Sequence, residues 1–199
     1  MRPALVVLAA GASERLGQPK ALVELGGESV LAHLCRAGAA VDGGRALVVV
    51  GRHARAIAER LPPGCRALAN PAWERGRSGG VRLAHRELPG RALLLAPVDV
   101  PRVPARVFEA LARKWDELGD PPLGWLAPRL GADAFGHPIV VGTGLLDLLE
   151  GLPADVPLRE LRSRATPLAA IEVFDPEILE DLDTPEDLER LRIRSAKGP

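Results

Sequence analysis

Apolar runs of strand length alternate with helix-like segments along this chain of 199 residues. The clearest runs lie at 4–9, 46–50 and 91–96 and are almost continuously apolar, as expected for strands buried on both faces. Further strands are predicted at 65–69, 125–127, 139–141 and 168–173, and helices at 29–40, 55–61, 78–87, 104–118, 144–149, 158–162 and 185–192. The alternation predicts an α/β fold of three layers with a mainly parallel sheet. No repeat or long linker divides the chain, so we expect one domain over 1–199, with a frayed tail at 195–199.

Composition excludes several classes of protein. The 26 Lys plus Arg balance the 26 Asp plus Glu, so the net charge of zero removes the general attraction that sequence-independent nucleic-acid binding needs. No apolar run approaches the ~20 residues that span a bilayer. The two cysteines, Cys35 and Cys65, are too few for a disulfide framework, and Cys35 fits an apolar helix face as a small core residue. We therefore expect a cytoplasmic protein with no nucleic-acid or membrane partner; composition leaves the oligomeric state undetermined.

The loop after the first strand, at 8–20, has the composition of a phosphate-binding loop. Its small residues and glycines let backbone N–H groups approach an anion, and Arg15 and Lys20 supply positive charge. The loop matches neither the Walker A pattern nor GxGxxG, and it lacks the lysine–hydroxyl pair of a P-loop, which disfavours a P-loop kinase. A mobile surface loop with solvated charges is the alternative.

Carboxylates occur at two places where a sheet of this kind presents ligands. Asp99 follows the strand at 91–96, so it could bridge a divalent cation to phosphate oxygens, or it could open a turn or cap a helix. In the stretch 181–188, helix capping explains Glu186 and Asp187 well and Asp183 less well.

Two further segments carry polar residues. In 70–81, Asn70, Trp73 and Ser78 fit either a ligand contact or a turn followed by a helix cap. His137 precedes a proline and lies alone; His33, His53 and His85 are expected on helix or loop surfaces, away from any Ser or Cys nucleophile. A hydrolase triad is therefore disfavoured.

These motifs together resemble a known family. The pattern LAAGxSxRxGxxK at 8–20, Asn70 with Trp73, DVP at 99–101, GHPI at 136–139 and DLDTPEDL at 181–188 occur in the family's order. They resemble the nucleotidyltransferases that join an NTP to a phosphorylated acceptor, above all the molybdenum cofactor cytidylyl- and guanylyltransferases (MobA/MocA-like). The resemblance implies a Rossmann-like nucleotidyltransferase fold over nearly the whole chain.

The resemblance also implies roles for individual residues. Arg15, Lys20 and Asp99 would be catalytic, Asp99 and Asp183 would hold Mg²⁺, and His137 would lie near the acceptor. Nucleotide contacts are implied for Leu8, Ala9, Ala10, Gly11, Ser13, Arg15, Lys20, Asn70 and Ser78. The chain departs from the family where serines are replaced by Gly79 and Gly80, whose backbone could still donate hydrogen bonds.

The implied reaction transfers an NMP from an NTP to a phosphorylated small-molecule acceptor, with molybdopterin implied, and releases pyrophosphate. The segment Gln18-Pro19-Lys20 after Ala-Ala-Gly is closer to the cytidylyl group, which favours CTP, with GTP possible. One alternative is a cytidylyl- or uridylyltransferase acting on a sugar or isoprenoid-precursor phosphate. A second, of another class, is a non-enzymatic nucleotide-binding regulatory protein.

Overall fold

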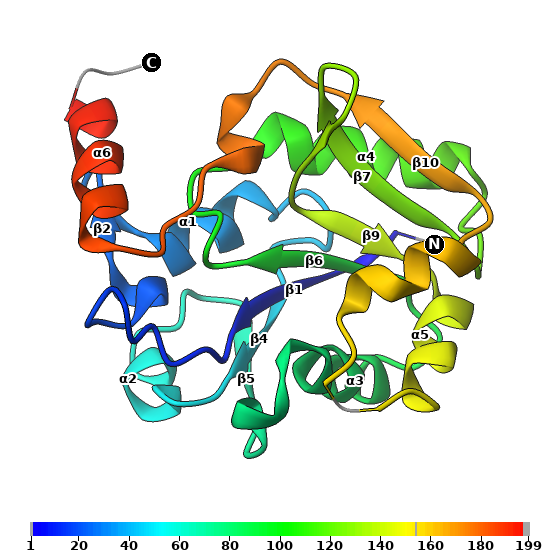
Figure 1. Ribbon diagram of the computed structural model, residues 1–199, viewed down its shortest axis with the longest axis horizontal. Helices are drawn as coiled ribbons and strands as arrows, with labels where there is room; N and C mark the ends of the chain where they lie inside the picture. The colour runs from blue at the N-terminus through cyan, green and yellow to red at the C-terminus, as the bar shows by residue number, and fades with distance from the viewer. Residues whose placement is uncertain (1, 154, 197–199) are drawn as a thin grey trace.

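The computed structural model describes residues 2–153 and 155–196, and a mixed sheet forms its centre (Figure 1). Within these residues the strand order is β10-β7-β9-β6-β1-β4-β5, with β8 paired to β7. The strands are β1 (Ala4–Ala9), β4 (Ala46–Val50), β5 (Cys65–Ala69), β6 (Leu93–Pro97), β7 (Trp125–Leu130), β8 (Ala134–Phe135), β9 (Ile139–Val141) and β10 (Leu168–Glu172). The pairs of β1 with β4 and β6, of β4 with β5 and of β7 with β10 are parallel, whereas β9 runs antiparallel to both β6 and β7. The predicted mainly parallel sheet is confirmed.

Helices cover both faces of this sheet. Figure 1 shows α1 (Val30–Ala37) and α4 (Ala105–Glu117) above the sheet, and α3 (Arg77–Glu87) and α5 (Thr143–Glu150) below it. The short helix α2 (Ala54–Ala58) follows β4, and α6 (Pro185–Ala196) lies at one end of the molecule. The 3-10 helices are η1 (Lys20–Leu22), η2 (Trp73–Arg75), η3 (Leu158–Arg164) and η4 (Pro176–Leu179). The three-layer α/β architecture is that expected from the sequence.

Strand β1 shows why the central runs are apolar throughout. Leu5, Val7 and Ala9 point into the core beneath α1 and α4, while Ala4 and Val6 point into the second core beneath α3 and α5. Side chains alternate between the two faces of a strand, so a strand covered by helices on both sides needs apolar residues at odd and even positions alike.

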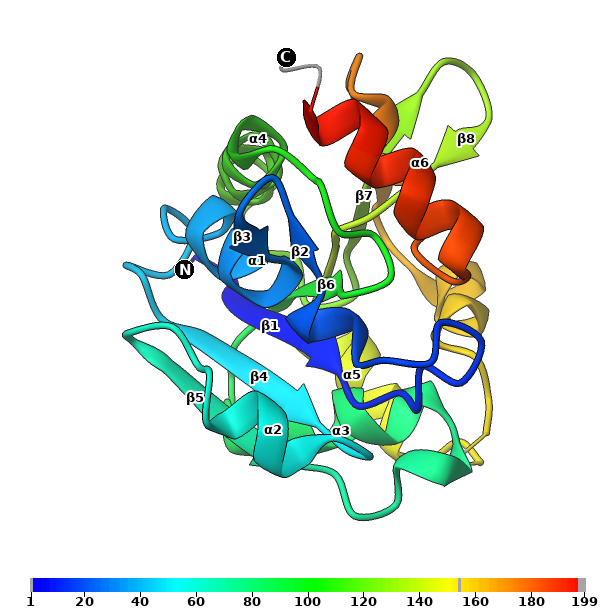
Figure 2. The same ribbon diagram turned by 90° about the vertical axis from the view of Figure 1, so that its left-hand side faces the viewer.

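Several boundaries differ from those expected. Helix α1 ends at Ala37 instead of residue 40, and Ser29 precedes it as an N-cap whose hydroxyl accepts a hydrogen bond from the Ala32 N–H. A hairpin of β2 (Glu24–Leu25) and β3 (Glu28–Ser29) was not predicted, and Figure 2 shows it beside α1. The expected helix at 158–162 is 3-10 helix η3.

The segment for which a frayed tail is predicted, 195–199, begins inside a helix. Ser195 and Ala196 belong to the last turn of α6, and the Ser195 hydroxyl donates to the Leu191 carbonyl at 2.9 Å. Residues 197–199 lie outside the described residues.

Candidate active site

A cavity of about 490 Å³ opens at the carboxyl edge of four neighbouring parallel strands, β6, β1, β4 and β5. Loops that are far apart in the sequence meet there because the carboxyl ends of parallel strands lie on one side of a sheet. The lining residues are Leu8, Ala10, Gly11, Ala12, Ser13, Glu14, Arg15, Lys20, Val49, Asn70, Trp73, Glu74, Gly76, Gly80, Pro97, Val98, Asp99 and Asp183. The structure therefore brings the loop at 8–20 and both predicted metal-ligand aspartates to one cavity.

The loop after β1 is folded back on itself by two residues with left-handed backbone conformation. Ser13 has φ of 55° and Gly17 has φ of 74°. The Gly17 N–H donates to the Ser13 carbonyl at 3.0 Å, and the Lys20 N–H donates to the Ser13 hydroxyl at 3.3 Å. Leu16 is buried in the core between them. These contacts turn the loop so that Arg15 and Lys20 both reach the cavity.

Two residues to which the sequence analysis assigned no role in the site, Gly51 and His53, pack against the side of this loop that faces away from the cavity. Gly51 ends β4, and a Cβ there would lie 2.3 Å from the Ala10 carbonyl oxygen and 2.7 Å from Cβ of Trp73. His53, at the start of α2, donates from Nε2 to the Ala12 carbonyl at 3.0 Å. A glycine directly after a buried strand indicates a close backbone approach. The sequence could not show that the groups approached are the Ala10 carbonyl and Trp73, because these lie in other segments.

Asp183 is the centre of the charged end of the cavity. Lys20 donates from Nζ to Oδ1 of Asp183, and Arg15 donates to Oδ2 at 2.8 Å. The side chain of Lys20 is 13% exposed, whereas that of Arg15 is 69% exposed. The hydrogen bond from Lys20 is the main reason why the pKa of Asp183 lies below its ordinary value, and the charges of Lys20 and Arg15 add to the effect. Asp183 is thus ionised and cations already compensate its charge.

Asp99 and the segment before α6 are joined through the backbone. The Leu182 N–H donates to the Asp99 carbonyl at 2.8 Å, which places the loop after β6 against the turn that carries Asp183. Burial raises the pKa of Asp181, and the negative charges of Asp99 and Asp183 raise it further. Three carboxylates therefore interact here, although the described residues contain no group of three or more side chains arranged to hold a metal ion.

The turn that carries Asp183 is itself fixed by a capping box at the start of α6. Asp187 accepts from the backbone N–H groups of Asp183 and Thr184, both at 3.0 Å, and the Asp187 N–H donates to the Thr184 hydroxyl at 3.2 Å. The bond from the Asp183 N–H is the main reason why the pKa of Asp187 is lowered to about 2. The expected capping role of Asp187 thus also positions Asp183.

Apolar side chains and one amide line most of the opposite end of the cavity, beside the exposed Glu74. Leu8, Ala10, Val49 and Trp73 line it together with Asn70, whose side-chain oxygen accepts from the Ala72 N–H at 3.1 Å. Asn70 follows β5 and Asp99 follows β6, and three strand spacings of ~4.8 Å separate these strands, about 14 Å in all. The cavity is therefore elongated across the strand ends, with charged groups at one end and an apolar, amide-bearing surface at the other.

Three of the predicted site residues do not line the cavity. Ala9 points into the core beneath α1 and α4. Ser78 is buried, and its hydroxyl donates to the Val156 carbonyl instead of facing the cavity. His137 donates from its backbone N–H to the Ile178 carbonyl at 3.0 Å, near η4. The structure thus directs the side chains of Ala9 and Ser78 away from the cavity.

The other histidines and cysteines lie outside the cavity. His85 is not on the surface as expected: it is buried between α3 and α5, with Nε2 2.8 Å from Oδ1 of Asp147. Cys35 is buried in the core, as expected, and burial is the main reason why the pKa of its thiol is raised.

In the described part of the chain, no helix combines the length and the apolar character needed to cross a bilayer.

Comparison with known proteins agrees with this geometry. A family model described as the MobA-like NTP transferase domain matches residues 5–168. The chain is 37% identical over 152 residues to the bifunctional enzyme IspD/IspF of Anaeromyxobacter sp. (strain Fw109-5). That match covers 71% of this chain but 38% of the enzyme, so the chain spans well under half the length of this relative.

Solved structures share the fold over nearly the whole chain. Rv0371c from Mycobacterium tuberculosis H37Rv matches with a TM-score of 0.79 and 26% identity, covering 97% of this chain and 98% of that one. A complex of Rv0371c with manganese matches with a TM-score of 0.73 and 24% identity, covering 97% and 99%. Molybdopterin-guanine dinucleotide biosynthesis protein A from Archaeoglobus fulgidus matches with a TM-score of 0.73 and 20% identity, covering 98% and 99%. Since the family model spans most of the chain, this protein belongs to the MobA-like NTP transferase domain family of nucleotidyltransferases.

Proposed function

We propose that this protein transfers an NMP from an NTP, with CTP favoured over GTP, to a phosphorylated acceptor and releases pyrophosphate. The observation that carries the proposal is the convergence of Arg15, Lys20, Asp99 and Asp183 on one cavity. An elongated cavity with cations at one end and an apolar, amide-bearing end suits a triphosphate joined to a base. Molybdopterin is the acceptor that the sequence motifs favour.

The chain's own residues supply binding and charge compensation. When the NTP binds, Arg15 and Lys20 would replace their hydrogen bonds to Asp183 with hydrogen bonds to the phosphate oxygens. They would then bind the pyrophosphate as it leaves. An oxygen of the acceptor phosphate would attack the α-phosphorus in line with the leaving pyrophosphate. That oxygen is already ionised near neutral pH, so the site needs no strong general base. Positioning and electrostatics are then the main contributions of the protein.

The carboxylates fit a divalent cation shared with the substrate. Mg²⁺ is commonly bound through one or two protein carboxylates together with substrate phosphates, so a site without three protein ligands is appropriate for it. Asp99 and Asp183 would hold the ion, and Asp183 is ionised, as a ligand must be. When bound, Mg²⁺ would neutralise charge on the phosphates and orient them. The manganese complex of Rv0371c supports a divalent cation in proteins of this fold.

The acceptor is supported less directly. The Archaeoglobus protein named for molybdopterin-guanine dinucleotide biosynthesis shares the fold. The IspD/IspF relative favours, as a second candidate, an isoprenoid-precursor phosphate as the acceptor. Both candidates use the same triphosphate site, so they differ in the acceptor that completes the reaction.

A panel of substrates tests the proposal. Pyrophosphate release is measured with each of the four NTPs and Mg²⁺, in the presence of molybdopterin, a sugar phosphate, an isoprenoid-precursor phosphate or no acceptor. We expect release that needs molybdopterin, is fastest with CTP and is about 10²- to 10³-fold slower in Asp99→Asn. If pyrophosphate is released only with another acceptor, that compound takes the place of molybdopterin in the proposal. If the protein binds nucleotides but releases no pyrophosphate under any condition, the non-enzymatic regulatory alternative is favoured.

A further inference from the structure

Two successive glycines in the first turn of α3 differ sharply in the space around them. A Cβ added at Gly80 would lie 3.0 Å from Cγ1 of Val49 on β4. At Gly79, the nearest neighbour of an added Cβ would be Nδ2 of Asn70, at 3.9 Å. A methyl group therefore fits at position 79, whereas at position 80 it forces α3 or Val49 to shift by a few tenths of an ångström.

Val49 has little freedom to make that shift. It is fully buried on a central strand, and its β-branched side chain has few allowed rotamers. Val81 and Ala84, further along α3, pack into the same core as Val49. In an interior packed this densely, an added carbon forces neighbouring side chains off their rotamers or shifts the backbone, and Val49 is restricted in both respects. The helix is thus the part expected to move.

The first turn of α3 forms part of the apolar end of the cavity. Gly80, Val49 and Asn70 all line it. Because the Asn70 oxygen accepts from the Ala72 N–H, the amide nitrogen is the atom that faces α3, 3.7 Å from the position of a Cβ at Gly80. Displacement of α3 would therefore change the distance between the helix and this amide, and an added methyl group would occupy space beside it.

We propose that Gly80 is a positioning residue for the nucleotide base. The absence of a side chain lets α3 lie directly on β4 and keeps the Asn70 amide and the first turn of the helix at the separation that the base requires. The inference rests on the proposed nucleotide site, because the cations at Arg15 and Lys20 assign the triphosphate to the other end.

The test separates base binding from triphosphate binding. Equilibrium titrations with Mg²⁺ present compare the four NTPs with inorganic tripolyphosphate, which has no base. Isothermal titration calorimetry measures both affinities, because its signal does not depend on which end of the cavity is filled. Since small misplacements in a site are costly, we expect Gly80→Ala to weaken binding of the preferred NTP about tenfold and to leave tripolyphosphate binding unchanged. Gly79→Ala is the matched control: it adds the same methyl group to the same helical turn, where there is room, and we expect binding within about twofold of wild type.

A second variant shows whether the cause is steric. The double variant Val49→Ala/Gly80→Ala removes the atom that the new methyl group meets, and we expect it to recover most of the lost affinity. Equal NTP affinity in the two glycine variants, an equal loss for tripolyphosphate, or no recovery in the double variant would each overturn the inference. A wild-type protein that binds no NTP would instead refute the proposed function.

Discussion

Replacing Lys20 with methionine tests how the charged end of the cavity works. Methionine keeps an unbranched apolar side chain of similar length and removes the ammonium group that contacts Asp183. In the ligand-free protein, Asp183 would keep its 2.8 Å hydrogen bond from Arg15, so its carboxylate would not lose every partner. Because the Asp183 side chain is 29% exposed and water would solvate it in place of Lys20, we expect the free energy of unfolding to fall by only about 1 kcal/mol, the upper value for a solvent-accessible ion pair. The pKa of Asp183 should rise, because the Lys20 hydrogen bond is the main cause of its lowering.

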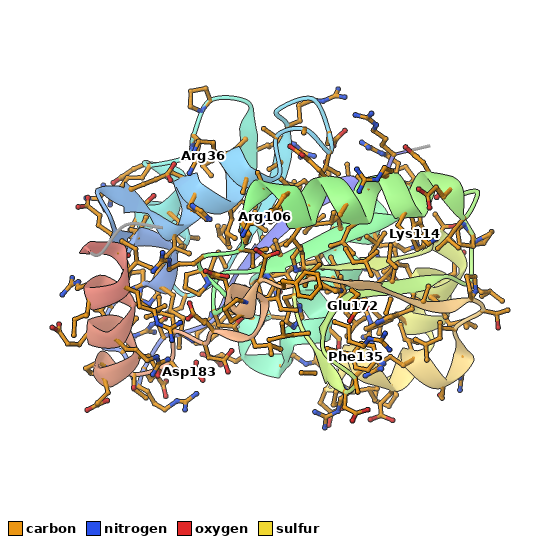
Figure 3. All side chains as sticks on the ribbon, turned by 90° about the horizontal axis from the view of Figure 1, so that it is seen from above. Arg36, Arg106, Lys114, Phe135, Glu172 and Asp183 are labelled. Carbon is orange, nitrogen blue, oxygen red and sulfur yellow. The ribbon has the colours of Figure 1, made fainter. Side chains whose placement is uncertain are left out.

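The effect on catalysis should be larger than the effect on stability. A hydrogen bond to a charged group contributes about 1.5–3 kcal/mol, which corresponds to a loss in kcat/KM of about 10- to 150-fold. The assay is pyrophosphate release at saturating acceptor, paired with urea unfolding of the same protein. Lys114→Met is the matched control, because Lys114 pairs with Glu117 on α4 and lies far from Asp183 in Figure 3. Wild-type kcat/KM in Lys20→Met would refute the phosphate role, and a stability loss above about 3 kcal/mol would refute the compensation by Arg15.

Three other substitutions test separate parts of the site. Asp99→Asn should lower turnover by about 10²- to 10³-fold and weaken the dependence of the rate on Mg²⁺ concentration, and an unchanged Mg²⁺ dependence would remove Asp99 from the metal site. Asp187→Ala should lower the free energy of unfolding by about 1–2 kcal/mol near pH 6 through loss of the cap. Because the pKa of Asp187 is lowered to about 2 from 3.8, this contribution is complete above pH 3.8 and disappears as the pH falls through about 2. Urea unfolding from pH 6 down to pH 3 should therefore show the gap to wild type beginning to narrow, and a gap that widens on acidification would contradict this. Gly51→Ala should cost about 1–3 kcal/mol and raise KM for the NTP, because its Cβ would meet the Ala10 carbonyl at 2.3 Å; unaltered unfolding and kinetics would show that the loop is not held there.

The capping box illustrates how local chemistry is readable from sequence. Thr184, Pro185 and Asp187 indicate the start of a helix. Helix α6 begins at Pro185, and the Asp187 N–H donates to the Thr184 hydroxyl. The same holds for β1, whose continuous apolar run predicted burial on both faces. Helix starts and buried strands can be predicted in this way because they depend on residues that are close together in the sequence.

The antiparallel direction of β9 is a different case. Ile139–Val141 is a short apolar run whose residues favour a strand without indicating which way it runs or which strands it joins. Its pairing with β6 and β7 depends on how the chain returns across the sheet. The burial of His85 could not be predicted from the sequence either, because its hydrogen-bond partner, Asp147, lies on another helix.

Periodicity and turn chemistry are local properties. The alternating α/β architecture, the composition of the loop after β1 and the acidic residues near the strand ends could therefore be predicted from the order of the amino acids alone. Three contacts could be found only in the folded chain: the hydrogen bond between Lys20 and Asp183, 163 positions apart, that of Ser78 to Val156, and the packing of Gly80 on Val49. These contacts depend on distances between elements, which are set by the packing of two cores against one sheet and are not encoded in any single segment.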